Sequence, residues 1–125
     1  MNLVLLSVDL LVFSRVDGVA AKLKVLLRRM DSLESIQRAW EEFSADLIVV
    51  DLGAVGIDVE AVVRWVRSLE KPVAVIAFGP HVHVQKLNQA KQFGCDQVYV
   101  RGDFLSRLES IIAHNMPTRT KDQTG

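Results

Sequence analysis

An unbroken apolar run lies between two aspartates in the segment Asp46-Leu47-Ile48-Val49-Val50-Asp51-Leu52, and Gly53 ends it. A strand that is apolar on both faces has to be covered on both faces, which is typical of the central strands of parallel sheets. The carboxylate of Asp51 comes where this strand is expected to end. Because ligands gather at the carboxyl edge of the strands in open α/β sheets, Asp51 is the first candidate for a functional residue.

Four further apolar stretches predict the other strands of the same sheet. Residues 73–78 are apolar on both faces and predict a second central strand. The apolar residues within 24–30 are closely flanked by charges and predict an outer strand, with a helix as the alternative. Two short strands are expected at residues 3–6 and 98–100.

Segments with apolar residues at helical spacing separate these strands. Asp31 or Ser32 is expected to cap the second helix and Asp58 the third, because their side chains can accept the first free amides. Gly94 is placed to close the fourth helix in a left-handed conformation. The helices are expected at residues 10–23, 33–44, 59–70, 82–93 and 104–112.

Strand and helix alternate five times with short connections. This order predicts an α/β fold: a single doubly wound, flavodoxin-like domain with a five-stranded parallel sheet and helices on both faces. The expected strand order is 2-1-3-4-5. The domain is assigned to residues 1–115, and the polar residues 116–125 are expected to form a flexible C-terminal tail.

The composition is that of one domain with a substantial core. Of the 125 residues 50% are hydrophobic, and 15 basic residues balance 15 acidic ones. A neutral chain has no overall electrostatic drive toward nucleic acid or an anionic membrane, so neither is an expected partner. Cys95 is the only cysteine, which excludes an intrachain disulfide and a cysteine-based zinc site and favours a cytoplasmic location. The apolar start at residues 1–6 is too short for a signal peptide or a membrane span.

Three stretches resemble motifs of the receiver domains of bacterial response regulators. They are the strand ending at Asp51, the segment Lys71-Pro72-Val73-Ala74-Val75-Ile76, and Gly94-Cys95-Asp96 before the last strand. In spacing and character they are similar to the family's usual stretches DLIILDL, PVIVLTA and GADDYLTKPF. The resemblance extends from Leu3 to Ala113, and it implies that Asp51 matches the aspartate that takes a phosphoryl group.

The acidic pair that helps a receiver to hold Mg²⁺ is not intact in this chain. Mg²⁺ prefers oxygen ligands in octahedral geometry, and the family supplies further acidic groups at the end of the first strand. Ser7-Val8-Asp9 stand there, so Asp9 is either one surviving acid or a helix cap, and Ser7 is the alternative cap. The resemblance therefore implies at most a weak Mg²⁺ site on Asp9 and Asp51, and no other cofactor is expected.

Three further positions depart from the receiver pattern. Ala77 stands where the family has a hydroxyl on the fourth strand, and alanine cannot donate a hydrogen bond. Arg101 replaces the lysine at the end of the fifth strand, which keeps the charge but not the compact ammonium. Val98 takes the place of the aromatic switch residue, and Tyr99 is expected to point to the opposite face of the sheet.

These departures predict a degenerate receiver, or pseudo-receiver, that is not an enzyme and acts as a phosphorylation-independent protein-interaction module in bacterial signal transduction. The first alternative is an active phospho-receiver, with Asp51 as phosphoacceptor, Asp9 on Mg²⁺ and Arg101 as the cation. A weaker alternative is an α/β domain that binds an anionic ligand near Ser7, Gly53 and Arg101. Asp51 also fits a structural role, hydrogen-bonded to loop amides or paired with Arg101.

The resemblance implies a partner surface on the fourth helix, the fifth strand and the fifth helix. Its candidate residues are Lys86, Gln89, Tyr99 and Arg107. The expected partner is a histidine kinase or an output protein, with a homodimer as the alternative.

Two other features have ordinary structural explanations. His81-Val82-His83 has no acidic or cysteine residue nearby in the sequence, so solvated loop histidines are preferred over a metal site. Trp40 and Trp65 lie on the apolar stripes of predicted helices and are expected to pack in the core.

Overall fold

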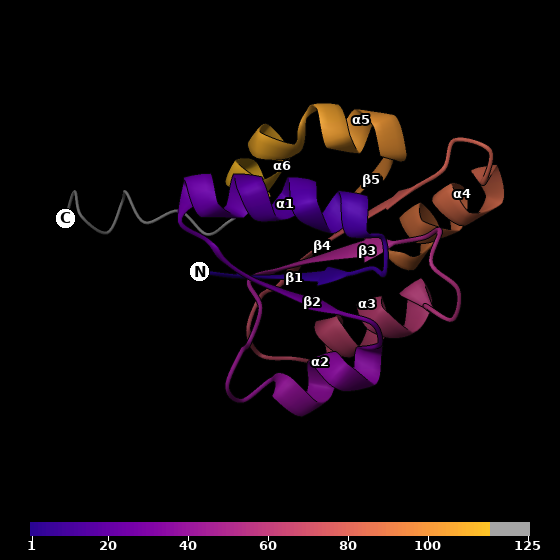
Figure 1. Cartoon of the computed structure of the whole chain (residues 1–125). Helices are drawn as coiled ribbons and strands as arrows, with labels where there is room; N and C mark the ends of the chain where they lie inside the picture. The colour runs from indigo at the N-terminus through magenta and orange to yellow at the C-terminus, as the bar shows by residue number, and fades with distance from the viewer. Residues whose placement is uncertain (116–125) are drawn as a thin grey trace.

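The computed structural model describes residues 1–115, in which strands and helices alternate along the chain (Figure 1). The strands are β1 (Asn2–Leu6), β2 (Leu26–Met30), β3 (Leu47–Asp51), β4 (Ala74–Gly79) and β5 (Gln97–Val100). The helices are α1 (Leu10–Leu23), α2 (Leu33–Ala39), α3 (Val59–Arg67), α4 (Val84–Phe93), α5 (Arg101–Ser106) and α6 (Leu108–Asn115). None of these helices is long and apolar enough to cross a bilayer. The tail predicted at residues 116–125 lies outside the described residues.

All five strands are parallel and join in the order β2-β1-β3-β4-β5, as predicted. Every residue of β3 is buried, and the four residues before Asp51 are accordingly apolar on both faces of the sheet. β2 lies at an edge of the sheet, and its residues are exposed or half-buried, as the flanking charges predicted. The register pairs Leu6 of β1 with Val50 of β3, so Ser7 and Asp51 follow side by side where these strands end.

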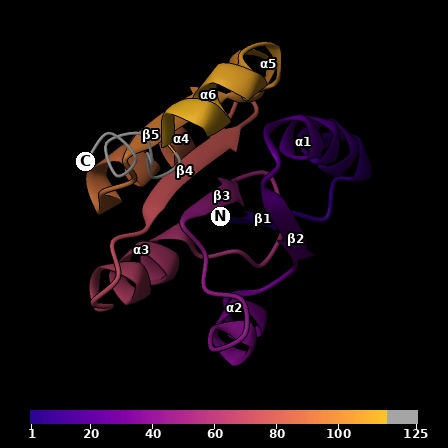
Figure 2. The ribbon, with the colours of Figure 1, turned by 90° about the vertical axis from the view of Figure 1, so that its left-hand side faces the viewer.

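Helices cover both faces of the sheet, and the strand side chains alternate between two cores. In Figure 1, α1, α5 and α6 lie above the sheet and α2 and α3 lie below it, and Figure 2 shows the same layers from the side. Leu47 and Val49 of β3 belong to the core beneath α1, whereas Ile48 and Val50 belong to the core formed with α2, α3 and α4. The same alternation directs Asp51 toward the side of α1 and α5.

The two tryptophans pack against the core formed with α2, α3 and α4, as predicted. Trp40, which follows α2, meets Trp65 of α3 edge to face, with ring centroids 4.9 Å apart and an interplanar angle of 80°. This geometry is favourable for aromatic rings and joins the two helices below the sheet.

The predicted caps are confirmed. Asp58 accepts a hydrogen bond from the amide of Ala61, and Ser32 accepts one from the amide of Ser35. Each cap therefore satisfies an amide that a helix start leaves unpaired. Gly94 ends α4 with a φ of 103°, a left-handed conformation that glycine adopts without the steric cost of a Cβ.

Several predicted helix bounds need correction. The expected last helix is two helices, because the backbone leaves helical geometry at Arg107, with φ −117° and ψ 23°. The second and third helices end early, because the amide that follows each bonds to the carbonyl three residues before it and closes a tight last turn. The corrected helices are Leu33–Ala39, Val59–Arg67 and Val84–Phe93.

Candidate functional site

Asp51 ends β3 with 7% of its surface exposed, and both of its carboxylate oxygens are hydrogen-bonded inside the protein. The hydroxyl of Ser7 donates to Oδ2 at 2.7 Å, and the amide of Gly53 donates to Oδ1 at 2.9 Å. A Cβ at position 53 would lie 3.2 Å from Oδ1, so a glycine suits this close approach. The prediction that a loop amide binds Asp51 is confirmed.

Ser7 is fully buried, and each of its polar groups has a partner. Its hydroxyl donates to Asp51 and accepts a hydrogen bond from the amide of Asp9 at 3.1 Å. Its own amide donates to the carbonyl of Met30 at 3.1 Å, and its carbonyl accepts from Arg29 at 3.0 Å. Three segments of the chain therefore hold Ser7 beside Asp51, a contact that the sequence reasoning missed.

Asp9 caps helix α1 and does not act as a second acidic ligand beside Asp51. Its Oδ1 accepts hydrogen bonds from the amides of Leu11 and Val12, and its Oδ2 accepts one from Arg101 at 2.9 Å. Partial burial raises the pKa of Asp9, but the hydrogen bonds from Val12, Arg101 and Leu11 outweigh burial and hold the pKa below its ordinary value. Of the two predicted roles for Asp9, the structure supports the cap.

Arg101 begins α5 and directs its guanidinium to Asp9. The ion pair joins residues 92 positions apart, with about a third of each side chain exposed (37% and 34%). An exposed pair of this kind contributes about 0–1 kcal/mol to stability. Within residues 1–115 no ion pair joins Arg101 to Asp51, so the alternative that they pair is wrong.

The end of β4 places an aromatic ring, not a hydroxyl, on the side of Asp51. Ala77 is fully buried in the core formed with α2, α3 and α4. Phe78 pairs in register with Asp51 and stacks on Phe104 of α5, with ring centroids 4.6 Å apart and an interplanar angle of 3°. This buried stack was not predicted, although counting alternate residues along the strand points to Phe78 as the residue on that face.

The residues present do not fit the Mg²⁺ site that the receiver resemblance implies. Mg²⁺ in proteins is held by one or two carboxylates together with other oxygen ligands. Asp51 supplies a single carboxylate whose oxygens already accept hydrogen bonds, and Asp9 is turned toward α1. In the part of the chain that the structure describes, no three His, Cys, Asp or Glu side chains group so as to hold a metal ion, and this part includes His81 and His83.

The four residues of the predicted partner surface lie at two separate places in the structure. Lys86 and Gln89 are exposed on α4 and line a cavity of about 270 Å³ beside the start of α3. Tyr99 belongs to the core beneath α1, on the face opposite Val98 as predicted, and the Arg107 guanidinium lies 5.3 Å from the centre of its ring. The structure therefore joins Tyr99 to Arg107 and places Lys86 and Gln89 next to α3.

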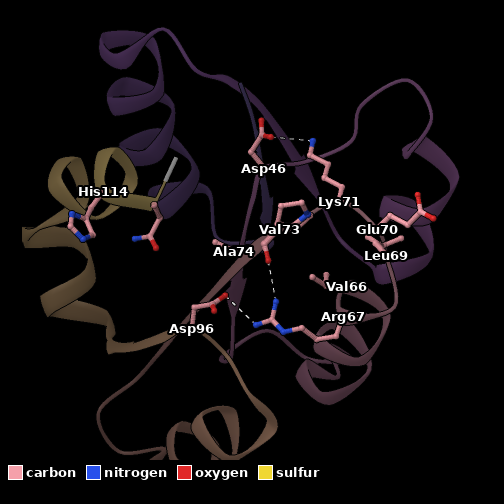
Figure 3. Close-up of a pocket in the computed structure, with 12 residues that line it drawn as sticks. Asp46, Val66, Arg67, Leu69, Glu70, Lys71, Val73, Ala74, Asp96 and His114 are labelled. Atoms are coloured by element: carbon pink, nitrogen blue, oxygen red, sulfur yellow. Dashed lines mark hydrogen bonds and ion pairs between the residues drawn. The ribbon is translucent and has the colours of Figure 1, made fainter. Parts of the chain in front are cut away.

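A hollow of about 630 Å³ lies at the opposite, amino edge of the sheet (Figure 3). Its ion pairs are internal, with Lys71 on Asp46 at 3.1 Å and Arg67 on Asp96 at 3.2 Å. Arg67 also donates to the carbonyl of Val73 at 3.1 Å. Because these four charges are paired with one another within the protein, Asp51 remains the centre of the candidate site.

No family model and no curated protein matches this sequence. Solved structures do match it. The receiver domain of NtrX from Brucella abortus aligns over 92% of this chain and 97% of that one, with a TM-score of 0.75 and 15% identity. This chain has the fold of a receiver domain. The predicted sheet, strand order and fold class are thus confirmed by an independent comparison.

Other receivers of the same fold are equally distant in sequence. HP1043, an orphan response regulator of H. pylori, aligns over 94% of this chain and 97% of its own, with a TM-score of 0.75 and 13% identity. The BeF3-activated DrrB receiver domain aligns over 91% and 95%, with a TM-score of 0.74 and 11% identity. A longer NtrX chain from Brucella abortus, in complex with ADP, aligns over 98% of this chain, which covers 28% of it, with 14% identity.

Proposed function

We propose that this chain is a degenerate receiver: a domain that is not an enzyme and that binds a protein partner in bacterial signal transduction without being phosphorylated. The receiver fold and the place of Asp51 at the end of β3 support a signalling role. The observation that carries the proposal is that the charged neighbours are turned away from Asp51. Asp9 and Arg101 bind each other, while Asp51 keeps neutral partners in Ser7 and Gly53.

The geometry opposes phosphoryl transfer to Asp51 for a physical reason. Such transfer depends on positioned positive charge and hydrogen-bond donors at the phosphoryl oxygens. The guanidinium of Arg101 is 2.9 Å from Asp9, and Ala77 has no hydroxyl to offer. A phosphoryl group on Oδ2 of Asp51 would also displace the Ser7 hydroxyl from a fully buried position.

Incubation with acetyl phosphate and Mg²⁺, followed by mass spectrometry of the intact protein, tests the proposal. We expect the mass of the wild-type chain to stay unchanged, as it does for an Asp51→Asn control. A gain of one phosphoryl group that the Asp51→Asn change abolishes would overturn the proposal.

An active phospho-receiver is the second candidate, because Asp51 ends the central strand in a fold shared with a BeF3-activated receiver domain. Asp51 is then the phosphoacceptor, Asp9 holds Mg²⁺ and Arg101 is the cation. This candidate requires Asp9 and Arg101 to leave their present contacts. The anionic-ligand alternative is weaker, since Ser7 and the amide of Gly53 already bind Asp51.

The partner surface is proposed on the side of β5 and α5, where Arg107 lies over Tyr99. The exposed Arg107 presents a planar cation that suits a carboxylate on a histidine kinase, an output protein or a second copy of this chain. Lys86 and Gln89 form a separate candidate patch on α4.

Sedimentation tests whether a second copy of this chain binds at Arg107. If the chain forms a dimer through this surface, Arg107→Glu is expected to abolish the dimer, and Arg64→Glu on α3 is the matched control. A dimer that survives Arg107→Glu counts against this surface.

A further inference from the structure

We infer that Ser7 is the residue that keeps a divalent cation off Asp51, and that a carboxylate at position 7 would turn this edge into a cation site. The inference rests on the proposed function, because it explains why the Mg²⁺ site implied by the fold does not fit this chain. Ser7 acts through Asp51 and is therefore a positioning residue.

Position 7 is the place from which a side-chain oxygen reaches Asp51 directly. The parallel register pairs Leu6 with Val50, so the next residues of β1 and β3 stand side by side. The Ser7 oxygen lies 2.7 Å from Oδ2, and exposure is 0% for Ser7 and 7% for Asp51. The two oxygens already have the close spacing that neighbouring ligands of one small cation adopt.

The Ser7 hydroxyl disfavours the binding of a cation at Oδ2 of Asp51. Ser7 gives its one hydroxyl proton to Asp51 and accepts the amide of Asp9, so its hydrogen-bonding groups are used within the protein. A cation at Oδ2 would displace that proton donor from a buried position. Among residues 1–115 it would find no second carboxylate to offset its lost hydration, since Asp9 binds the start of α1 and Arg101.

A carboxylate at position 7 would make cation binding at Asp51 favourable. Two carboxylates in a buried position repel each other, and a cation between them removes the repulsion. Because the folded chain alone would bind the cation at this place, the stability of a Ser7→Asp variant should depend on the cation concentration. The neutral variant Ser7→Asn has nearly the same size and lacks the charge, which makes it the matched control.

Two measurements on the whole chain test the inference. Amide NMR with MnCl₂ locates a bound cation, because a paramagnetic ion broadens nearby signals. Thermal unfolding with MgCl₂, compared with NaCl at matched ionic strength, measures the coupling to stability. For Ser7→Asp we expect loss of the Asp51 and Gly53 amide signals and a rise in melting temperature that NaCl does not reproduce. Wild type, Ser7→Asn and the double variant Ser7→Asp/Asp51→Asn should show neither effect.

The outcomes separate this inference from the proposed function. A folded Ser7→Asp chain that responds to neither cation overturns the inference and leaves the proposed function standing. A wild-type chain that binds either cation at Asp51 also overturns the inference, whereas the proposed function is overturned by a phosphoryl group gained from acetyl phosphate at Asp51. If Ser7→Asp is unfolded without cation, refolding by MgCl₂ but not by NaCl supports the inference, and failure to refold overturns it.

Discussion

Two carboxylates at opposite edges of the sheet, Asp51 and Asp46, are held in different ways. At the carboxyl edge, Asp51 is 7% exposed and is bound by neutral donors, of which the Ser7 hydroxyl is itself fully buried. At the amino edge, Asp46 accepts a hydrogen bond from the amide of Asn2 and is also paired with the cation of Lys71, and the side chains of that ion pair are 17% and 35% exposed. Asp51, at the edge where receiver chemistry would take place, is therefore the more buried of the two carboxylates, and among residues 1–115 no ion pair joins it to a cation.

This difference predicts which of the two carboxylate contacts contributes more to stability. A buried group that loses its hydrogen-bond partner costs about 1–3 kcal/mol, and more when the group is charged. A partly exposed ion pair contributes about 0–1 kcal/mol, because water and salt screen it. Asp51 is the candidate phosphoacceptor, yet its carboxylate makes the contact that is expected to stabilise the fold more. This supports a structural rather than a catalytic role for Asp51.

Ser7→Ala should have the largest effect, lowering the free energy of unfolding by about 2–3 kcal/mol. The change removes the hydrogen-bond donor to the buried Oδ2 of Asp51 and the acceptor of the half-buried amide of Asp9. Urea unfolding followed by circular dichroism measures it, with Ser14→Ala on the exposed side of α1 as the control. A loss no larger than that of Ser14→Ala would break the distinction between the two edges.

Asp9→Asn should have a smaller effect that depends on pH. Asparagine keeps the cap but removes the charge that Arg101 binds. Because the pKa of Asp9 is held below its ordinary value, the ionised group stabilises the fold at higher pH, and this stabilisation is lost as the pH falls through the lowered pKa. The difference in unfolding free energy between wild type and variant should be full at neutral pH and shrink below about pH 4.

Urea unfolding at a series of pH values checks this dependence. A difference between wild type and Asp9→Asn that grows on acidification would show that the charge of Asp9 does not act as described.

Lys71→Gln at the amino edge should have the smallest effect, about 0.5 kcal/mol or less. The ion pair with Asp46 is partly exposed, so added NaCl should reduce the loss further. Urea unfolding at low and high salt measures both effects. If Lys71→Gln costs as much as Ser7→Ala, burial does not distinguish the edges.

The fold was predictable because its decisive signals are local. A strand buried on both faces must be apolar on both faces, as in the run that ends at Asp51, and caps such as Asp58 act within one turn. The break at Arg107 was not predictable, because Leu105, Leu108 and Ile111 continue the apolar spacing across it.

The site was predictable only in outline. The position of Asp51 follows from the strand, but its contact with Ser7 joins residues 44 positions apart and depends on the register of β1 against β3. A shift of one residue would bring a different side chain to Asp51. The same dependence left two roles open for Asp9, and the geometry of the first turn of α1 separates them.

The most direct test of the central claim, that neutral partners hold Asp51 in an unphosphorylated domain, is an amide NMR titration of the wild-type chain with MgCl₂ and beryllofluoride, which mimics a phosphoryl group on aspartate. We predict no shifts centred on Asp51, Ala77 and Arg101. Shifts at these residues that the Asp51→Asn change abolishes would contradict the claim and make this chain an active phospho-receiver.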